Sequence, residues 1–159
     1  MRAAVLCLVL VIWVVVGLTA CGSGEEQTPA ACLRSGPAYA DALAQAPGEV
    51  RIGDGVAISD CLTKNQSAGD LSRVGVSMVS AATALNRRAQ LPPGPRRPAL
   101  EVGYLVGAAT EGASDTGGIH ANLIDRLTAA ARFSPRGQAL PQAFRRAYAT
   151  GYAAGEDHG

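Results

Sequence analysis

Apolar residues recur at intervals of three and four positions along most of the chain after residue 70. Because an α-helix turns once in about 3.6 residues, this spacing predicts helices with one apolar face. The first helix is expected to start near Asp70, a residue suited to a first turn or cap. Its apolar face is formed by Leu71, Val74, Met78, Ala82 and Leu85. It must end within residues 90–98, QLPPGPRRP, where four prolines and a glycine interrupt any helix.

Three further helices are predicted between this proline-rich connection and the C-terminus. The first covers residues 100–111, and the second follows the turn sequence SDTGG, where Asp115 or Thr116 is expected to cap it. The third follows Pro141, which suits a first helical turn. The second has an apolar face of Ile119, Leu123, Ile124, Leu127, Ala130 and Ala131. The third has an apolar face of Leu140, Phe144, Ala147, Tyr148 and Gly151.

The segment before residue 70 has a different pattern. Residues 38–46 predict a short helix that ends at Pro47-Gly48. In residues 49–58, apolar and polar positions alternate on both sides of a Gly-Asp-Gly turn at residues 53–55. This pattern is typical of a β-hairpin. A hairpin and an ordered loop are equally compatible with it.

The predicted fold is therefore all-α, a small bundle of four to five helices, with one possible hairpin near residues 49–58. Short connections favour antiparallel neighbours in such a bundle. Glycines four residues apart, Gly103/Gly107 and Gly151/Gly155, indicate that helix backbones approach closely within the domain. We expect residues 29–155 to form this single domain and residues 156–159 to form a polar tail.

The N-terminal segment is apolar from residue 3 to residue 17, after a basic start at Arg2. A basic start, an apolar run and a small-residue end are typical of a secretory signal. An uncleaved membrane helix is the alternative, because the run is close to the lower length limit for a span. After Cys21 the sequence becomes polar at once, as Gly-Ser-Gly-Glu-Glu-Gln.

The four residues Leu18-Thr19-Ala20-Cys21 resemble the lipobox of bacterial lipoproteins. The resemblance is to small lipoproteins of unassigned function and covers residues 1–21 only. It implies removal of residues 1–20, diacylglycerol on the Cys21 thiol, and a location at the outer face of the cell membrane. Residues 21–28 would then form a flexible tether. Two or more acyl chains anchor a protein stably, so the domain needs no apolar span of its own.

The cysteines fit this interpretation. Cys7 lies in the segment to be removed and Cys21 would carry the lipid, which leaves Cys32 and Cys61 as a pair. In an oxidising compartment the pair predicts a disulfide, with two buried free thiols as the alternative. Zinc is not expected, because the pair has no CxxC spacing and the chain has only 2 histidines.

Charge and composition reduce the number of function classes that the sequence allows. The chain has 14 Lys and Arg against 13 Asp and Glu, and removal of Arg2 with the leader would bring the net charge to zero. A nucleic-acid-binding domain would show a clear basic excess. The abundance of alanine and glycine, with Lys64 as the only lysine, is typical of a GC-rich bacterial genome such as an actinobacterial one.

Motifs for catalysis are weak. Asp115-Thr116-Gly117 matches the aspartic-protease triplet, but that chemistry needs a second carboxylate of the same kind, and a helix cap explains the triplet. His120 has no histidine or acidic residue at metal-ligand spacing and is expected to face solvent or to cap a helix. No GxSxG, SxxK or Cys-His arrangement and no cofactor motif occurs, so we interpret the chain as a non-enzyme.

Two arginine pairs, Arg87-Arg88 and Arg96-Arg97, flank the proline-rich connection. Arginines near a helix C-terminus interact favourably with the helix dipole, which is one explanation. The other is a basic rim that contacts anionic headgroups or envelope polymers.

The functional hypothesis is a lipid-anchored extracytoplasmic domain with a binding or structural role, whose partners are the membrane and an envelope protein or polymer. The alternative is a carrier or sensor of a small or lipidic ligand. A closed, alanine-packed core favours the first, and an apolar cavity of about 300 Å³ or more favours the second.

Overall fold

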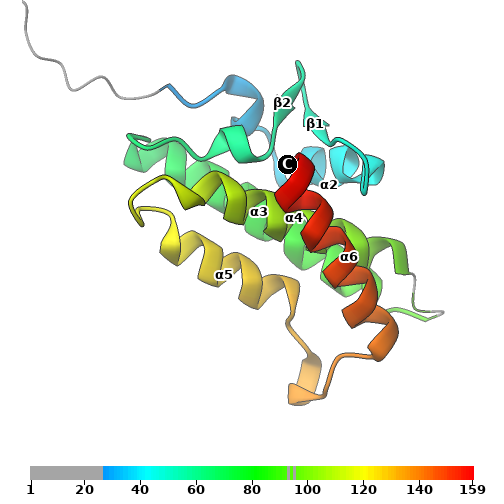
Figure 1. Ribbon diagram of the computed structural model, residues 1–159. Coiled ribbons are helices and arrows are strands. Elements are labelled where there is room, and N and C mark those ends of the chain that lie inside the picture. Colours follow the sequence, from blue (N-terminus) through cyan, green and yellow to red (C-terminus); the bar gives the residue numbers. More distant parts are fainter. Residues whose placement is uncertain (1–26, 93, 95) are drawn as a thin grey trace, which may run out of the picture.

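The computed structural model describes residues 27–92, 94 and 96–159, so the predicted signal segment and the lipid-attachment residue Cys21 lie outside it. The described residues form five α-helices and one short antiparallel hairpin, joined by single turns of 3₁₀ helix (Figure 1). The helices are α2 (Gly36–Ala42), α3 (Ala68–Ala89), α4 (Arg96–Ser114), α5 (Ala121–Ala131) and α6 (Gln142–His158). The predicted all-α bundle with a short hairpin is confirmed. No helix in this described part is long and apolar enough to cross a membrane.

The hairpin consists of β1 (Arg51–Ile52) and β2 (Val56–Ala57), with Ile52 opposite Val56. Gly53 and Gly55 adopt positive φ angles of 54° and 90°, which allow the tight turn between the strands. So short a hairpin is marginal alone. It is held on the helices by the fully buried Val50 and Ile52, and the Val50 N–H donates to the Tyr104 hydroxyl of α4 at 3.2 Å.

The longest of the described helices, α3, directly follows its capping residue, Ser67. The Ser67 hydroxyl accepts a hydrogen bond from the Asp70 N–H at 3.1 Å, and Asp70 occupies the first turn as expected. The predicted apolar face is buried against the rest of the bundle, apart from the half-buried Leu71. The short helix predicted at residues 38–46 is also present, as α2 followed by a 3₁₀ turn at Leu43–Gln45.

Two helix starts differ from the sequence prediction. Helix α4 begins at Arg96 rather than at residue 100, because Pro98 falls in the first turn, where its missing N–H breaks no helical hydrogen bond. Helix α5 begins only at Ala121, and neither Asp115 nor Thr116 caps it. The Thr116 hydroxyl instead donates to the Ala113 carbonyl at 2.7 Å and closes the end of α4.

The expected polar tail at residues 156–159 is also corrected. Helix α6 continues to His158, and the Ser59 hydroxyl donates to the carbonyl of Gly159. The end of α6 therefore packs beside the 3₁₀ turn Ser59–Cys61 and is part of the domain.

Helices α4 and α6 make the most extensive helix–helix contact of the bundle. They run in the same direction, since Gly103 faces Tyr148 and Gly107 faces Tyr152. From α6, Gly151 and Gly155 lie against the backbone of α4 in the same way. The predicted close approach at these glycines is confirmed. The expected antiparallel packing does not hold for this pair. Helix α5, which lies between them in sequence, returns the chain to the end of the bundle where α4 began, so α6 runs parallel to α4 (Figure 1).

A disulfide joins Cys32 to Cys61, with a Cα–Cα distance of 5.4 Å, as predicted. Both cysteines are fully buried, and the Tyr39 hydroxyl donates to the Cys32 carbonyl at 2.8 Å. The bridge connects the first turn of the domain to the segment that leads into α3. The hairpin and α2 lie within the loop that it closes.

Candidate functional site

Four helix ends meet at one end of the bundle, at the lower right of Figure 1. Helices α3 and α5 end there, and α4 and α6 begin there. The two arginine pairs singled out from the sequence lie on α3 and α4 at this end, and three further arginines join them from α5 and α6. We call this surface the arginine end. It comprises Arg87, Arg88, Arg96, Arg97, Arg132, Arg145 and Arg146.

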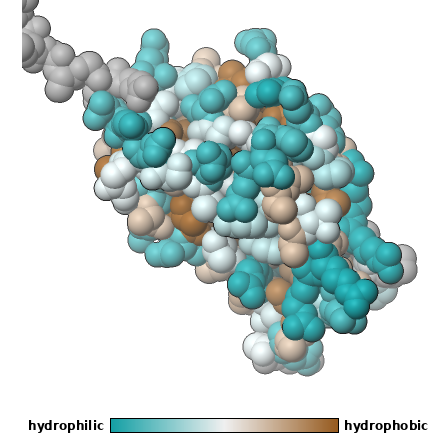
Figure 2. All heavy atoms as spheres, viewed as in Figure 1, coloured by the Kyte–Doolittle hydropathy of each residue, from teal (hydrophilic) through white to brown (hydrophobic). Residues whose placement is uncertain are grey.

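The sequence holds a signal for this surface beyond the two arginine pairs. Residues 71–100 and residues 126–155 contain five arginines each and no aspartate or glutamate. These two stretches include the four helix ends that meet. Overall neutrality therefore hides a separation of charge. On the face shown in Figure 2, hydrophilic side chains gather at the lower right, over the beginning of α6.

Within the described residues, Arg97 is the one member of the arginine end that pairs with a carboxylate. Its Nε lies 3.0 Å from Glu101 Oε1, and its guanidinium also donates to the Ala44 carbonyl. Glu101 is buried, so Arg97 neutralises an internal charge and ties α4 to the end of the α2 region. The other six arginines are exposed and have no carboxylate partner in the part of the chain that the structure describes. Arg97 is thus a structural residue, and the predicted basic rim depends on the remaining six.

A largely apolar groove of about 760 Å³ lies between α3 and α5 at the arginine end. Its apolar lining includes Leu91 and Phe133, whose side chains are 57% and 64% exposed, and Arg87 also lines it. The Asn86 side-chain amide donates to the carbonyls of Ala130 and Phe133 at 3.1 and 2.8 Å. These bonds satisfy carbonyls that the end of α5 would leave unpaired. The segment that carries Phe133 is therefore fixed to α3.

A second groove, of about 570 Å³, lies between the beginnings of α4 and α6. Arg96, Arg97 and Arg146 line it together with the polar side chains of Gln142 and Thr150. Because α4 and α6 are parallel, the positive ends of both helix dipoles point toward this region. Around this groove the two helix N-termini therefore favour anions, in addition to the charge of Arg96 and Arg146.

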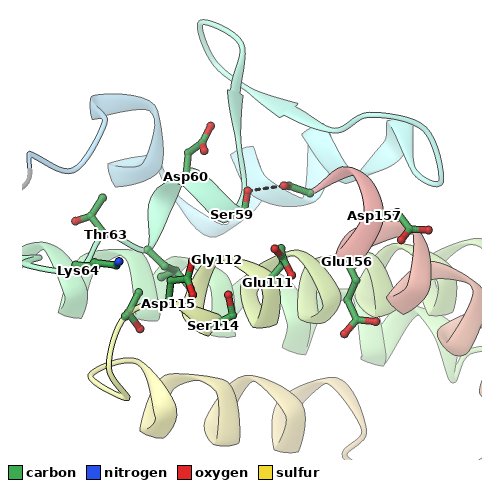
Figure 3. Close-up of a pocket in the computed structure, with 13 residues that line it drawn as sticks. Ser59, Asp60, Thr63, Lys64, Glu111, Gly112, Ser114, Asp115, Glu156 and Asp157 are labelled. Carbon is green, nitrogen blue, oxygen red and sulfur yellow. Dashed lines mark hydrogen bonds between the residues drawn. The ribbon is translucent and has the colours of Figure 1, made fainter.

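An acidic groove lies at the opposite end of the bundle (Figure 3). This groove, of about 660 Å³, is lined by five acidic side chains, Asp60, Glu111, Asp115, Glu156 and Asp157. Figure 3 shows that they point in different directions, with Asp60 and Asp157 turned away from each other. Among the described residues, no three His, Cys, Asp or Glu side chains are arranged to hold a metal ion. The Asp115-Thr116-Gly117 triplet belongs to this end and forms the turn after α4.

His120 is completely buried, which corrects the expectation that it faces solvent. Its Nε2 lies 2.9 Å from Gln66 Oε1, and the Gln66 amide donates to the Thr28 hydroxyl and to the Cys61 carbonyl, both at 2.9 Å. Since Gln66 Oε1 only accepts, this network assigns the imidazole proton to Nε2. Its Nδ1 has no hydrogen-bond partner in the described structure. Burial lowers the pKa of His120.

This histidine predicts a pH-dependent stability. In the unfolded chain His120 takes up a proton near its ordinary pKa of about 6.5, whereas the folded state holds it neutral to lower pH. The unfolded state therefore binds more protons, and the free energy of unfolding should fall as the pH is lowered below about 6.5. Urea unfolding between pH 8 and pH 5 measures this slope.

Two variants control the experiment. His120→Gln should flatten the slope, and His158→Gln should leave it unchanged, because His158 is exposed. A slope that is identical in the wild type and in His120→Gln would contradict the assignment.

No protein-family model, curated protein or solved structure matches this chain.

The arginine end combines unpaired cations, an apolar groove and exposed apolar side chains on rigid helix ends. It is the candidate functional site.

Proposed function

We propose that this protein is an exported, lipid-anchored domain that acts by binding at the outer face of the cell membrane. Leu18-Thr19-Ala20-Cys21 at the end of an apolar run supports cleavage and lipidation at Cys21. The Cys32–Cys61 disulfide is compatible with an extracytoplasmic location, because such bonds persist in oxidising compartments.

The binding surface in this proposal is the arginine end. The observation that carries it is a set of six exposed arginines without carboxylate partners in the described chain, beside an apolar groove. Such a field attracts anionic partners and accelerates their encounter with the surface. The close contact of α4 with α6 at Gly103, Gly107, Gly151 and Gly155 supports a binding or structural role, because the two backbones touch along that part of the pair.

A second candidate function, the binding of a small amphiphilic or lipidic ligand, is favoured by one observation. The groove between α3 and α5, with about 760 Å³, falls in the size range of ligand pockets and has a mainly apolar lining. A ligand there would lie at the surface, with Arg87 beside it, rather than inside the bundle.

Anchoring is tested by Cys21→Ala, with Cys7→Ala as the matched control in the same N-terminal segment. Loss of the thiol should abolish incorporation of a fatty-acid label and either block processing or release the protein from membranes. Cys7→Ala should be processed and labelled as the wild type is. Unchanged labelling, electrophoretic mobility and membrane retention in Cys21→Ala would refute the lipoprotein proposal.

A further inference from the structure

We propose that the arginine end docks on the surface of an anionic phospholipid bilayer, with Phe133 and Leu91 inserted among the headgroups. This inference rests on the proposed function, because it names the partner of the same binding surface. Electrostatic attraction brings the surface to the bilayer, and apolar insertion holds it there.

The two stretches of chain that form this surface, residues 71–100 and 126–155, contribute positive charge only. The six unpaired arginines come from four different helix ends, so they spread over the whole end of the bundle. The nearest acidic side chain along α4, Glu101, is buried and already paired with Arg97. The remaining acidic groove lies at the other end, beyond the length of α4. An anionic bilayer attracts each basic residue that reaches its surface.

The apolar component distinguishes a bilayer from a hydrophilic polymer. Phe133 and Leu91 line the same groove and are among the most exposed large apolar side chains of the described chain. They lie among arginines, whose apolar stems can follow them into the interface while the guanidinium groups stay at the phosphates. This mixture of exposed apolar and basic side chains is typical of surfaces that bind in the plane of the interface.

The insertion site is rigid. The Phe133 carbonyl accepts hydrogen bonds from Asn86 at 2.8 Å and from Gln90 at 2.7 Å, both on or just after α3. The backbone that carries Phe133 therefore needs no rearrangement before it contacts a bilayer, and little conformational entropy is lost on docking.

Anchoring at Cys21 and docking of the arginine end are sterically compatible. The domain begins at Thr28, which is bonded to Gln66 just before α3, whereas the arginine end lies at the far end of that helix. The 22 residues of α3 span about 33 Å. The seven residues from Gly22 to Thr28 reach about 23 Å, so the domain can tilt, with the arginine end on the bilayer and Thr28 raised above it.

The test uses tryptophan as a reporter of insertion. The single tryptophan of the chain, Trp13, lies in the segment that would be removed, so Phe133→Trp gives the processed protein one reporter. The processed protein is purified from cell envelopes and combined with vesicles of phosphatidylcholine alone or with added phosphatidylglycerol. We expect a blue-shifted emission, quenched by brominated lipid, with the phosphatidylglycerol vesicles only. Leu91→Trp is a second reporter if Phe133→Trp folds poorly.

The matched reporter is Val76→Trp. The exposed fraction of Val76, 61%, is similar to that of Phe133, but Val76 lies in the middle of α3 and outside the arginine end. Its emission should be the same with both kinds of vesicle. A shift of Val76→Trp as large as that of Phe133→Trp would overturn docking through this end.

The charge requirement is tested in the Phe133→Trp background. Arg87→Gln with Arg88→Gln should lower the ratio of docked to undocked protein roughly 30-fold. Arg34→Gln with Arg73→Gln changes the net charge equally but removes exposed arginines elsewhere, and should have little effect. Equal losses in the two double variants would show that net charge, not this surface, causes binding.

The results separate the inference from the proposed function. Flotation of the protein with pure phosphatidylcholine vesicles reports the lipid anchor alone. Failure to float with these vesicles refutes anchoring, while docking can still be measured with phosphatidylglycerol vesicles. Identical Phe133→Trp emission with both vesicle types refutes docking. A full shift produced by a dispersed short-chain anionic lipid, without vesicles, also refutes it and favours the ligand-binding alternative.

Discussion

Gly151→Ala is expected to lower the free energy of unfolding by about 3 kcal/mol, although alanine is the better helix former. A methyl group at this position would overlap the carbonyl oxygen of Leu100 on α4. A carbonyl of the helix backbone cannot turn aside as a flexible side chain can, so α4 and α6 must separate along their contact. The separation would disturb the largest helix pair of the bundle.

Gly69→Ala provides the control for this prediction. Gly69 is also helical, in the first turn of α3, but a methyl group there would have only the Ser67 hydroxyl as a neighbour, at 3.9 Å. Without a clash, the substitution should be neutral or stabilise by up to about 1 kcal/mol. Urea unfolding of the two variants compares them directly. Equal stability of Gly151→Ala and Gly69→Ala would show that the helices can accommodate the methyl group.

Removal of the disulfide by Cys32→Ala with Cys61→Ala should cost about 3–4 kcal/mol and lower Tm by about 12 °C or more. The bridge spans a sequence separation of 29, and without it the unfolded chain regains the freedom of that loop. The folded state loses little beyond the bond, because α2 and the hairpin keep their own contacts with α3 and α4.

Reductant supplies the control for the second prediction. Thermal unfolding of the wild type in dithiothreitol should approach that of the double variant, and the double variant itself should not respond to dithiothreitol. Reaction of Cys32 and Cys61 with an alkylating reagent in protein purified without reductant would contradict the bridge.

The parts of the fold that could be predicted are those set by neighbours in sequence. The apolar stripe of α3 follows from its own spacing, and the approach of α4 to α6 follows from Gly103 and Gly151. The start of α5 could not be predicted. Ile119 continues its apolar spacing, yet it is 45% exposed, because Gly117 and Gly118 take positive φ angles and delay the helix to Ala121.

Burial of a polar side chain is still harder to predict, since it depends on a distant partner. His120 lies shortly after Gly117-Gly118 and two residues before the polar Asn122, which favours an exposed position. Its partner Gln66 lies 54 residues away, and their bond is made inside the domain. No local pattern contains this information.

The same limit applies to the candidate site. The pairs Arg87-Arg88 and Arg96-Arg97 were identified from the sequence because one connection joins them. Phe133 was missed, because its place beside those pairs depends on how α5 returns the chain to the same end. The absence of acidic residues from both stretches was the available signal.

The position of the disulfide also determines how the domain would carry a mechanical load. A pulling force applied at the N-terminus enters at Thr28 and reaches Cys32 within the first turn. From there the covalent bridge transmits the tension to Cys61 and on toward α3, so residues 33–60 bear none of it while the bridge is intact. A protein tethered by this end in a cell envelope under shear would keep its hairpin and α2 folded, and reduction of one bond would expose both to extension.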